Sequence, residues 1–99
     1  MVIICRMFYP TESTQDMAKR FLEAPQVPDF MNRKGPYVGS SLTEGISIVA
    51  LYELDNSKLA EGMEFIGTYY AMFYGVPGFK YEIVPHFDVA EGLKMIGMG

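Results

Sequence analysis

The sequence predicts an α+β domain in which a four-stranded antiparallel sheet is combined with two helices and a short C-terminal helix. The first observation is the order of segments, which follow one another as strand, helix, strand, strand, helix, strand and helix. The second is that two strands are apolar enough to be central, whereas the other two have features of edge strands. The third is size, because 99 residues that are 49% hydrophobic are expected to form one domain over 1–99.

The first part of the chain predicts a strand, a helix and a long connection. The run MVIICRMFYP at 1–10 is apolar on both faces, which is typical of a central strand. A helix is predicted over 11–25, where Ser13 and Asp16 have the spacing of a capping box. We expect 25–36 to be a connection whose basic end is a surface loop, with a lid over a pocket as the alternative.

The middle of the chain predicts a hairpin followed by a second helix. Residues 37–45 predict a weak strand, because a glycine and two serines interrupt it, and weakness of this kind suits a sheet edge. The run ISIVALYEL at 46–54 is a strong strand and is expected to be central. A helix is predicted over 55–75, which opens with capping residues and closes at a glycine before a proline.

The C-terminal part predicts a last strand and a short helix. Residues 79–87 alternate as a strand, and Pro85 either ends it or places it at an edge. A short helix follows within 88–99, where Asp88 and Glu91 have capping-box spacing.

A ferredoxin-like βαββαβ sandwich explains these strand characters, because it places the first and third strands in the centre and both helices on one face. One strand face is almost purely apolar and is assigned to the helix-covered core: Ile3, Cys5, Met7, Tyr9, Ile46, Ile48, Ala50, Tyr52, Leu54, Phe79, Tyr81 and Ile83. The opposite face mixes apolar and charged residues: Val2, Ile4, Arg6, Phe8, Ser47, Val49, Leu51, Glu53, Lys80, Glu82, Val84 and His86. It is too apolar in its centre to face water, so we expect a second copy to pack there, sheet against sheet.

This pattern, from VIICRMFY through SIVALYEL to FKYEIVPHF, resembles the dimeric α/β-barrel superfamily over nearly the whole chain. In that superfamily, two ferredoxin-like subunits of similar length pair their sheets into a barrel. The resemblance implies a homodimer, and it implies a small aromatic or polyketide-like ligand between sheet and helices. Members include cofactor-free monooxygenases, cyclases and isomerases as well as proteins of unknown role.

Composition excludes several classes of function. A net charge of -4 without any basic run argues against a nucleic-acid partner. The single cysteine, Cys5, excludes a disulfide framework and a cysteine metal cluster, and one histidine cannot make a multi-histidine metal site within one subunit. No run is apolar enough for a membrane span, and no signal peptide is recognisable, so we expect a cytoplasmic protein without a membrane or cofactor partner.

The second predicted helix has an apolar arc about 200° wide, which is more than one sheet needs. One interpretation is that another helix covers the extra stripe. The other is a ligand pocket whose wall is rich in tyrosine, because a tyrosine offers an apolar ring and a hydrogen-bonding hydroxyl. The predicted pocket residues are Tyr52, Phe65, Tyr69, Met72 and Tyr81.

His86 is the side chain whose ordinary pKa lies nearest neutrality, so it is the candidate catalytic base. Simple alternation places it on the mixed face, where it would contact a partner subunit, unless Pro85 shifts the register through a bulge. Arg6 lies on the same face and is expected to pair with Glu53 or Glu82 at a dimer interface, with binding of an anionic substrate as the alternative.

Two functions follow from the sequence. The first is a homodimeric small-molecule-binding or oligomerisation domain with an apolar, tyrosine-lined pocket. The second is a cofactor-independent monooxygenase, cyclase or isomerase that acts on a small aromatic or polyketide-like compound, with His86 as general base. The first is favoured because the sequence contains no evident pair of nucleophile and base.

Overall fold

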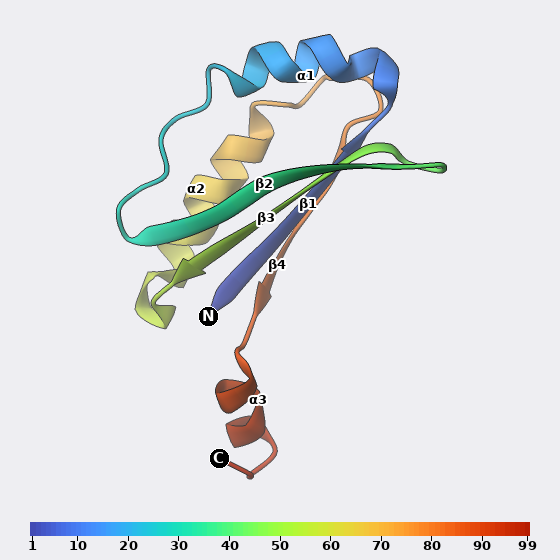
Figure 1. The fold of residues 1–99 in the computed structure, drawn as a ribbon. Coiled ribbons are helices and arrows are strands. Elements are labelled where there is room, and N and C mark those ends of the chain that lie inside the picture. Colours follow the sequence, from blue (N-terminus) through green and yellow to red (C-terminus); the bar gives the residue numbers. More distant parts are fainter.

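Four strands form one antiparallel sheet in the order β2-β3-β1-β4, in a computed structural model that describes residues 1–99 (Figure 1). The strands are β1 (Val2–Tyr9), β2 (Met31–Ser41), β3 (Gly45–Leu54) and β4 (Lys80–His86). The α+β class and the antiparallel sheet are confirmed. The two strands that are apolar on both faces, β1 and β3, occupy the centre.

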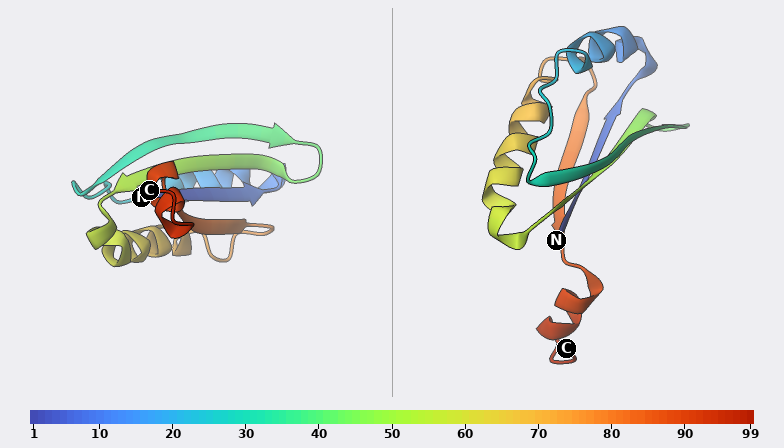
Figure 2. Two further views of the ribbon diagram at one scale, coloured as in Figure 1. Left: turned by 90° about the horizontal axis from the view of Figure 1, so that it is seen from below. Right: turned by 60° about the vertical axis from the view of Figure 1, so that its left-hand side comes forward.

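Three helices accompany the sheet. The helices α1 (Thr14–Phe21) and α2 (Leu59–Ala71) lie on the same side of it, and each follows a 3₁₀ turn (Figures 1 and 2). The short helix α3 (Val89–Met95) projects beyond the end of the sheet, away from the other two (Figures 1 and 2). None of these helices has the length and hydrophobicity required to cross a bilayer.

The core lies between the sheet and the pair α1 and α2. Alternate residues of β1 face it and are buried, because successive side chains of a strand point to opposite faces. The buried apolar core consists of residues from β1, β2, β3, α1, α2 and the segment after α2: Ile3, Cys5, Met7, Tyr9, Met17, Met31, Ala50, Tyr52, Leu54, Ile66, Tyr69, Tyr70, Phe73 and Val76. The opposite side of the sheet, called the open face below, carries Val2, Ile4, Arg6 and Phe8 of β1 and their neighbours on β2, β3 and β4.

The first helix is shorter than predicted and starts differently. It ends at Phe21 rather than near residue 25, and the Ser13 side chain makes no cap bond to it. The Ser13 hydroxyl instead donates to the carbonyl oxygen of Pro77 at 2.7 Å, which ties the start of α1 to the loop after α2. The capping-box prediction is therefore wrong at Ser13 and Asp16, because a tertiary hydrogen bond uses the hydroxyl.

The second strand is longer than predicted. Residues 31–34, expected in a connection, pair with 51–54 of β3, and the register shifts between Lys34 and Tyr37 around Gly35 and Pro36. Gly35 and Pro36 are the reason that the sequence does not predict this part of the strand, since each is unfavourable inside a regular β-ladder. The capping box of the last helix is confirmed, because the Asp88 side chain accepts from the Glu91 amide and the Glu91 side chain accepts from the Asp88 amide.

Phe73 is completely buried where α2 ends, and it packs edge to face on Tyr69 and beside Phe79. We predict that Phe73→Ala lowers the free energy of unfolding by about 3–5 kcal/mol, because it removes an aromatic side chain and leaves a cavity. Urea denaturation measures this loss. Leu22→Ala is the control, because that side chain is 83% exposed and should change stability by less than about 0.5 kcal/mol. A loss in Phe73→Ala no larger than in this control would contradict the packing described.

Candidate functional site

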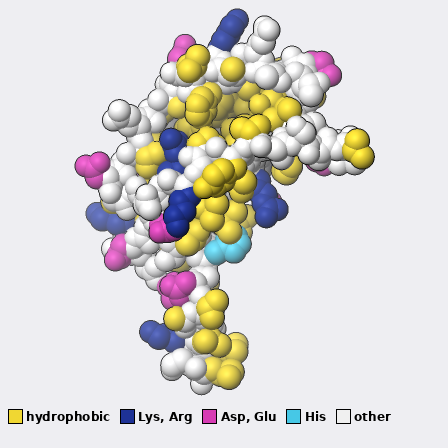
Figure 3. Space-filling model, in the orientation of Figure 1, with side chains coloured by type: hydrophobic (Ala, Val, Ile, Leu, Met, Phe, Trp, Pro, Cys, Tyr) yellow, Lys and Arg dark blue, Asp and Glu magenta, His cyan; other side chains and the backbone are white.

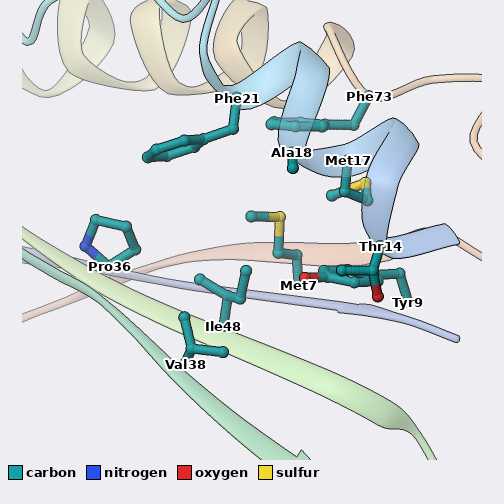
Figure 4. A pocket seen from close by; sticks show the side chains of 10 residues that line it. All are labelled: Met7, Tyr9, Thr14, Met17, Ala18, Phe21, Pro36, Val38, Ile48 and Phe73. Atoms are coloured by element: carbon teal, nitrogen blue, oxygen red, sulfur yellow. The ribbon is translucent and has the colours of Figure 1, made fainter. Parts of the chain in front are cut away.

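An apolar groove of about 250 Å³ opens between α1 and the sheet (Figure 4). The helix α1 contributes one side of the groove, and β1, β2 and β3 contribute the other (Figure 4). Phe73, from the segment after α2, lies on the α1 side of the groove near Ala18 (Figure 4). The lining residues are Met7, Tyr9, Thr14, Met17, Ala18, Phe21, Pro36, Val38, Ile48 and Phe73.

The groove lies where α1 leaves part of the sheet uncovered. The helix has only eight residues, about 12 Å, and it lies across one end of the sheet rather than along its strands (Figures 1 and 2). The apolar stripe of α1, with Met17 and Phe21 on one side of the helix, packs over only part of the sheet. The space between α1 and β2 is left unfilled, and Figure 3 shows hydrophobic side chains gathered in this hollow.

Polar contacts to neighbouring elements hold α1 over the groove. The Arg20 guanidinium donates through Nη1 to the carbonyl oxygens of Met72 at 3.0 Å and Tyr74 at 2.7 Å, which belong to the segment after α2. Its Nε donates to the Asp16 carboxylate at 3.1 Å. These bonds fix the C-terminal turn of α1, and the Ser13 bond to Pro77 fixes its start. The position of α1 over the groove is therefore held at both ends of the helix.

The groove carries hydroxyl groups but no charged side chain. The Thr14 hydroxyl donates to the carbonyl oxygen of Thr11 at 2.7 Å, so its oxygen can still accept a hydrogen bond. Burial raises the pKa of Tyr9 above its ordinary value, so its hydroxyl stays protonated near neutrality. Such a surface suits a neutral, largely apolar ligand with one or two hydrogen-bonding groups.

The predicted pocket residues lie elsewhere. Tyr52 and Tyr69 are buried in the core, Phe65 and Met72 pack against it half-buried, and Tyr81 is 36% exposed on β4. None of these five residues lines the groove. The cavity lies beside α1 rather than along the extra stripe of α2. One sequence feature could have located the groove. The apolar stripe of the first helix is short, because the helix ends at Phe21.

Several tyrosines pack together in a cluster that includes Tyr70, the neighbour of the Cys5 thiol. The rings of Tyr69 and Tyr70 meet edge to face with centroids 5.1 Å apart, and Tyr70 stacks on Tyr81 at 5.2 Å. Burial raises the pKa of Cys5 to about 12 and that of Tyr69 to about 12, and it raises the pKa of Tyr52 and Tyr70 as well. Because the charged forms are costly in this apolar setting, all of these groups are neutral at physiological pH.

The predicted interface residues all lie on the open face, paired within the chain. Arg6 Nε is 4.0 Å from Glu82 Oε1, with both side chains exposed. Glu53 does not pair with Arg6; it accepts from Lys34, with Nζ and Oε1 2.6 Å apart, and this contact lowers the pKa of the Glu53 carboxyl. Whether a partner subunit covers these residues stays a prediction.

His86 lies exposed at the end of β4, on the open face. The register continues regularly through Pro85, with His86 opposite Val2, so no bulge turns the imidazole toward the core. His86 Nδ1 is 2.8 Å from the carbonyl oxygen of Val84, and because a carbonyl only accepts, Nδ1 carries the hydrogen. The ring also lines a shallow hollow of about 250 Å³ with Ile4, Arg6, Glu82 and Val84. The sheet thus separates His86 from the groove.

We predict that the protein loses stability as the pH rises from about 9 to about 12. The ordinary pKa values are 9.0 for Cys5 and 10.0 for Tyr69, and burial raises both to about 12. The unfolded chain therefore releases protons before the folded chain does, so stability is complete below pH 9 and declines above it. Urea denaturation across this pH range measures the decline. Cys5→Ala should show a shallower decline; an identical slope would contradict the contribution of the thiol.

Comparisons with known proteins add little. No protein-family model matches the sequence, and no curated protein matches it. Among solved structures, a DUF3240 family protein from Shewanella baltica OS155 is similar over 88% of this chain and 91% of its own, with 13% identity and a TM-score of 0.34. A likeness this weak carries no argument about fold or function. What the geometry shows is an α+β protein with an uncharged apolar groove between α1 and the sheet.

Proposed function

We propose that this chain is a small-molecule-binding domain that works as a homodimer, with the groove beneath α1 as its ligand site. The observation that carries the proposal is the groove itself, whose apolar walls come from β1, β2, β3 and α1. We further propose that the subunit is a ferredoxin-like sandwich and that two open faces pair into a barrel.

The ligand class follows from the groove chemistry. A space of about 250 Å³ fits one or two fused rings, somewhat below the usual range for drug-sized ligands. No cation lines the groove to hold an acid group, and the Arg20 guanidinium of α1 is occupied by Asp16 and two carbonyl oxygens. The ligand is therefore a neutral aromatic compound that uses its polar group on Tyr9 or Thr14.

The open face supports self-association because its charges cancel. Its three cations each meet an acid of the same chain, in the pairs Arg6–Glu82, Lys34–Glu53 and Lys80–Glu44. Apolar side chains lie among these pairs: Val49 and Leu51 of β3, and Ile4 and Phe8 of β1 on either side of Arg6. Because each cation is paired with an acid, a second copy can approach this mixed surface without net repulsion.

Catalysis with His86 as base gains no support from this arrangement. The imidazole lies on the open face, whereas the groove lies on the helix-covered face, so His86 cannot reach a ligand in the groove of its own subunit. Its hydrogen-bond partner is a backbone carbonyl rather than the hydroxyl or thiol of a nucleophile. We therefore favour binding, and we assign His86 and Arg6 to the interface between subunits.

We predict that 2-naphthol raises the melting temperature of the protein and that 2-naphthoate, its charged counterpart, does not. The expected dissociation constant for naphthol is roughly 100 µM, at about 0.5 kcal/mol per non-hydrogen atom. Ala18→Trp should abolish the shift, because Ala18 lines the groove and an indole would fill it. Ala60→Trp, on an exposed position of α2, is the matched control and should keep the shift. Equal shifts in both variants would place the ligand outside the groove.

We predict that the protein is a dimer in sedimentation equilibrium at about 10 µM and that Leu51→Arg weakens the dimer at least about 100-fold. Leu51 lies between Ile4 and Lys34 on the open face, and a symmetric interface would bury the new charge twice. Ala60→Arg places the same charge on α2, away from the open face, and should leave the dimer intact. A monomeric wild-type protein would refute sheet pairing.

A further inference from the structure

Two tyrosine side chains meet at their hydroxyls on the surface of the protein. Tyr74 follows α2, and Tyr81 lies in β4, which the chain enters after it turns back beyond α2 (Figure 1). The two phenol oxygens are 2.5 Å apart, which is a short hydrogen bond. Tyr74 is 56% exposed and Tyr81 is 36% exposed, so a reagent in solution can reach both side chains. Because neither residue lines the groove, the pair is separate from the proposed ligand site.

The backbones that carry these two rings are both held in place. The Tyr74 amide donates to the Ala71 carbonyl oxygen at 3.1 Å, and the Tyr74 carbonyl oxygen accepts from Arg20 Nη1 at 2.7 Å. Tyr81 pairs with Met7 of β1 within the sheet. The contact between the two hydroxyls is therefore a property of the fold rather than an encounter of two mobile segments.

The ring geometry brings an edge of one phenol to an edge of the other. The ring centroids of Tyr74 and Tyr81 are 6.0 Å apart, and the ring planes differ by 33°. Two phenols that met end to end through the same hydrogen bond would hold their centroids farther apart, so the two ring axes converge at an angle. This convergence brings the carbons next to the C–O bonds, the Cε atoms, toward each other. In a phenoxyl radical these are the carbons that carry unpaired electron density and form new bonds.

The other close tyrosine pairs lack this combination of exposure and geometry. Tyr69 and Tyr70 are only 3% and 1% exposed, and their ring planes meet at 86°. Tyr70 and Tyr81 are stacked, with ring planes only 7° apart. A bond between two ring carbons must lie in the plane of each ring, and face-to-face stacking prevents that. Tyr74 and Tyr81 are thus the pair that is exposed, hydrogen-bonded and in contact at the ring edges.

We propose that Tyr74 and Tyr81 are a site of oxidative modification, at which one-electron oxidation joins the two rings as dityrosine. The oxidant is hydrogen peroxide acting through a haem peroxidase, which takes one electron from each phenol while each hydroxyl releases its proton. The two phenoxyl radicals couple through a Cε–Cε bond, and the hydrogen on each of these carbons then moves to the oxygen and restores the hydroxyl. Two phenols and one hydrogen peroxide thus give one dityrosine and two water molecules. The fold supplies the proximity that this coupling requires.

The new bond closes a loop, residues 74–81, that holds α1 in place. Within this loop, the Pro77 carbonyl oxygen accepts from the Ser13 hydroxyl, and the Tyr74 carbonyl oxygen accepts from Arg20. A crosslink stabilises a fold by restricting the unfolded chain. The oxidised wild-type protein should therefore unfold at a higher urea concentration than Tyr74→Phe treated in the same way. Equal midpoints would contradict this stabilising effect.

Oxidation of the dilute full-length chain with hydrogen peroxide and a haem peroxidase tests the site. The expected product is a monomer that has lost two hydrogen atoms and has the fluorescence of dityrosine. Trypsin cleaves after Lys80, so the crosslink should join the peptides 59–80 and 81–94, and fragmentation in the mass spectrometer should place it at Tyr74 and Tyr81. A bond from Tyr81 to Tyr70 overturns the proposal. So does the absence of a crosslinked monomer under conditions that couple free N-acetyltyrosinamide.

Single substitutions separate this pair from the general reactivity of exposed tyrosines. Tyr74→Phe and Tyr81→Phe should each lower the yield of crosslinked monomer at least about 100-fold, because each removes a phenol from the pair but keeps the ring. Tyr37→Phe is the matched control and should keep the wild-type yield, because Tyr37 is 57% exposed, like Tyr74, but lies outside the pair. Circular dichroism verifies that the variants are folded. A wild-type yield in Tyr74→Phe, or its loss in Tyr37→Phe, overturns the proposal.

Discussion

The structure depends on one constraint, which is that two helices cover only one face of a sheet whose central strands are apolar on both. β1 buries Ile3, Cys5 and Met7 under the helices, while the same strand presents Ile4 and Phe8 on the other side. Burial of the first set forms the core, and each fully buried side chain of this kind contributes about 1.5–3 kcal/mol. The second set keeps a similar gain available for association. Folding therefore buries the apolar residues on one face of the sheet, and pairing with a second copy would bury those on the other face.

Incomplete coverage of the sheet by helices also produces the groove, in this case on the helix-covered face. A first helix of two turns leaves part of the sheet uncovered even on its helix side, so Pro36, Val38 and Ile48 line an open groove. The Arg20 contacts keep the short helix in place without extending it.

The sequence predicts the class, the sheet and its faces well because burial on alternate residues is a strong local signal. Ile3, Cys5 and Met7 could be assigned to the core from periodicity alone. The errors occur where a tertiary contact replaces a local one: Ser13 bonds to Pro77 instead of capping α1, and Gly35 and Pro36 interrupt β2 without ending it. The groove lies away from the predicted pocket residues for a related reason: a cavity forms where the elements leave space, and no periodic pattern of residues predicts such a space.

The burial of Cys5 has a practical consequence. It is the single cysteine of the chain, and a thiol with a pKa near 12 is almost entirely in its unreactive protonated form at neutral pH. Alkylating probes therefore find no native target on the folded protein. A cysteine introduced on α1 or β4 would be the one site that takes a fluorophore or spin label. Cys5 therefore need not be replaced before labelling, and movements of individual elements can be followed without altering the core.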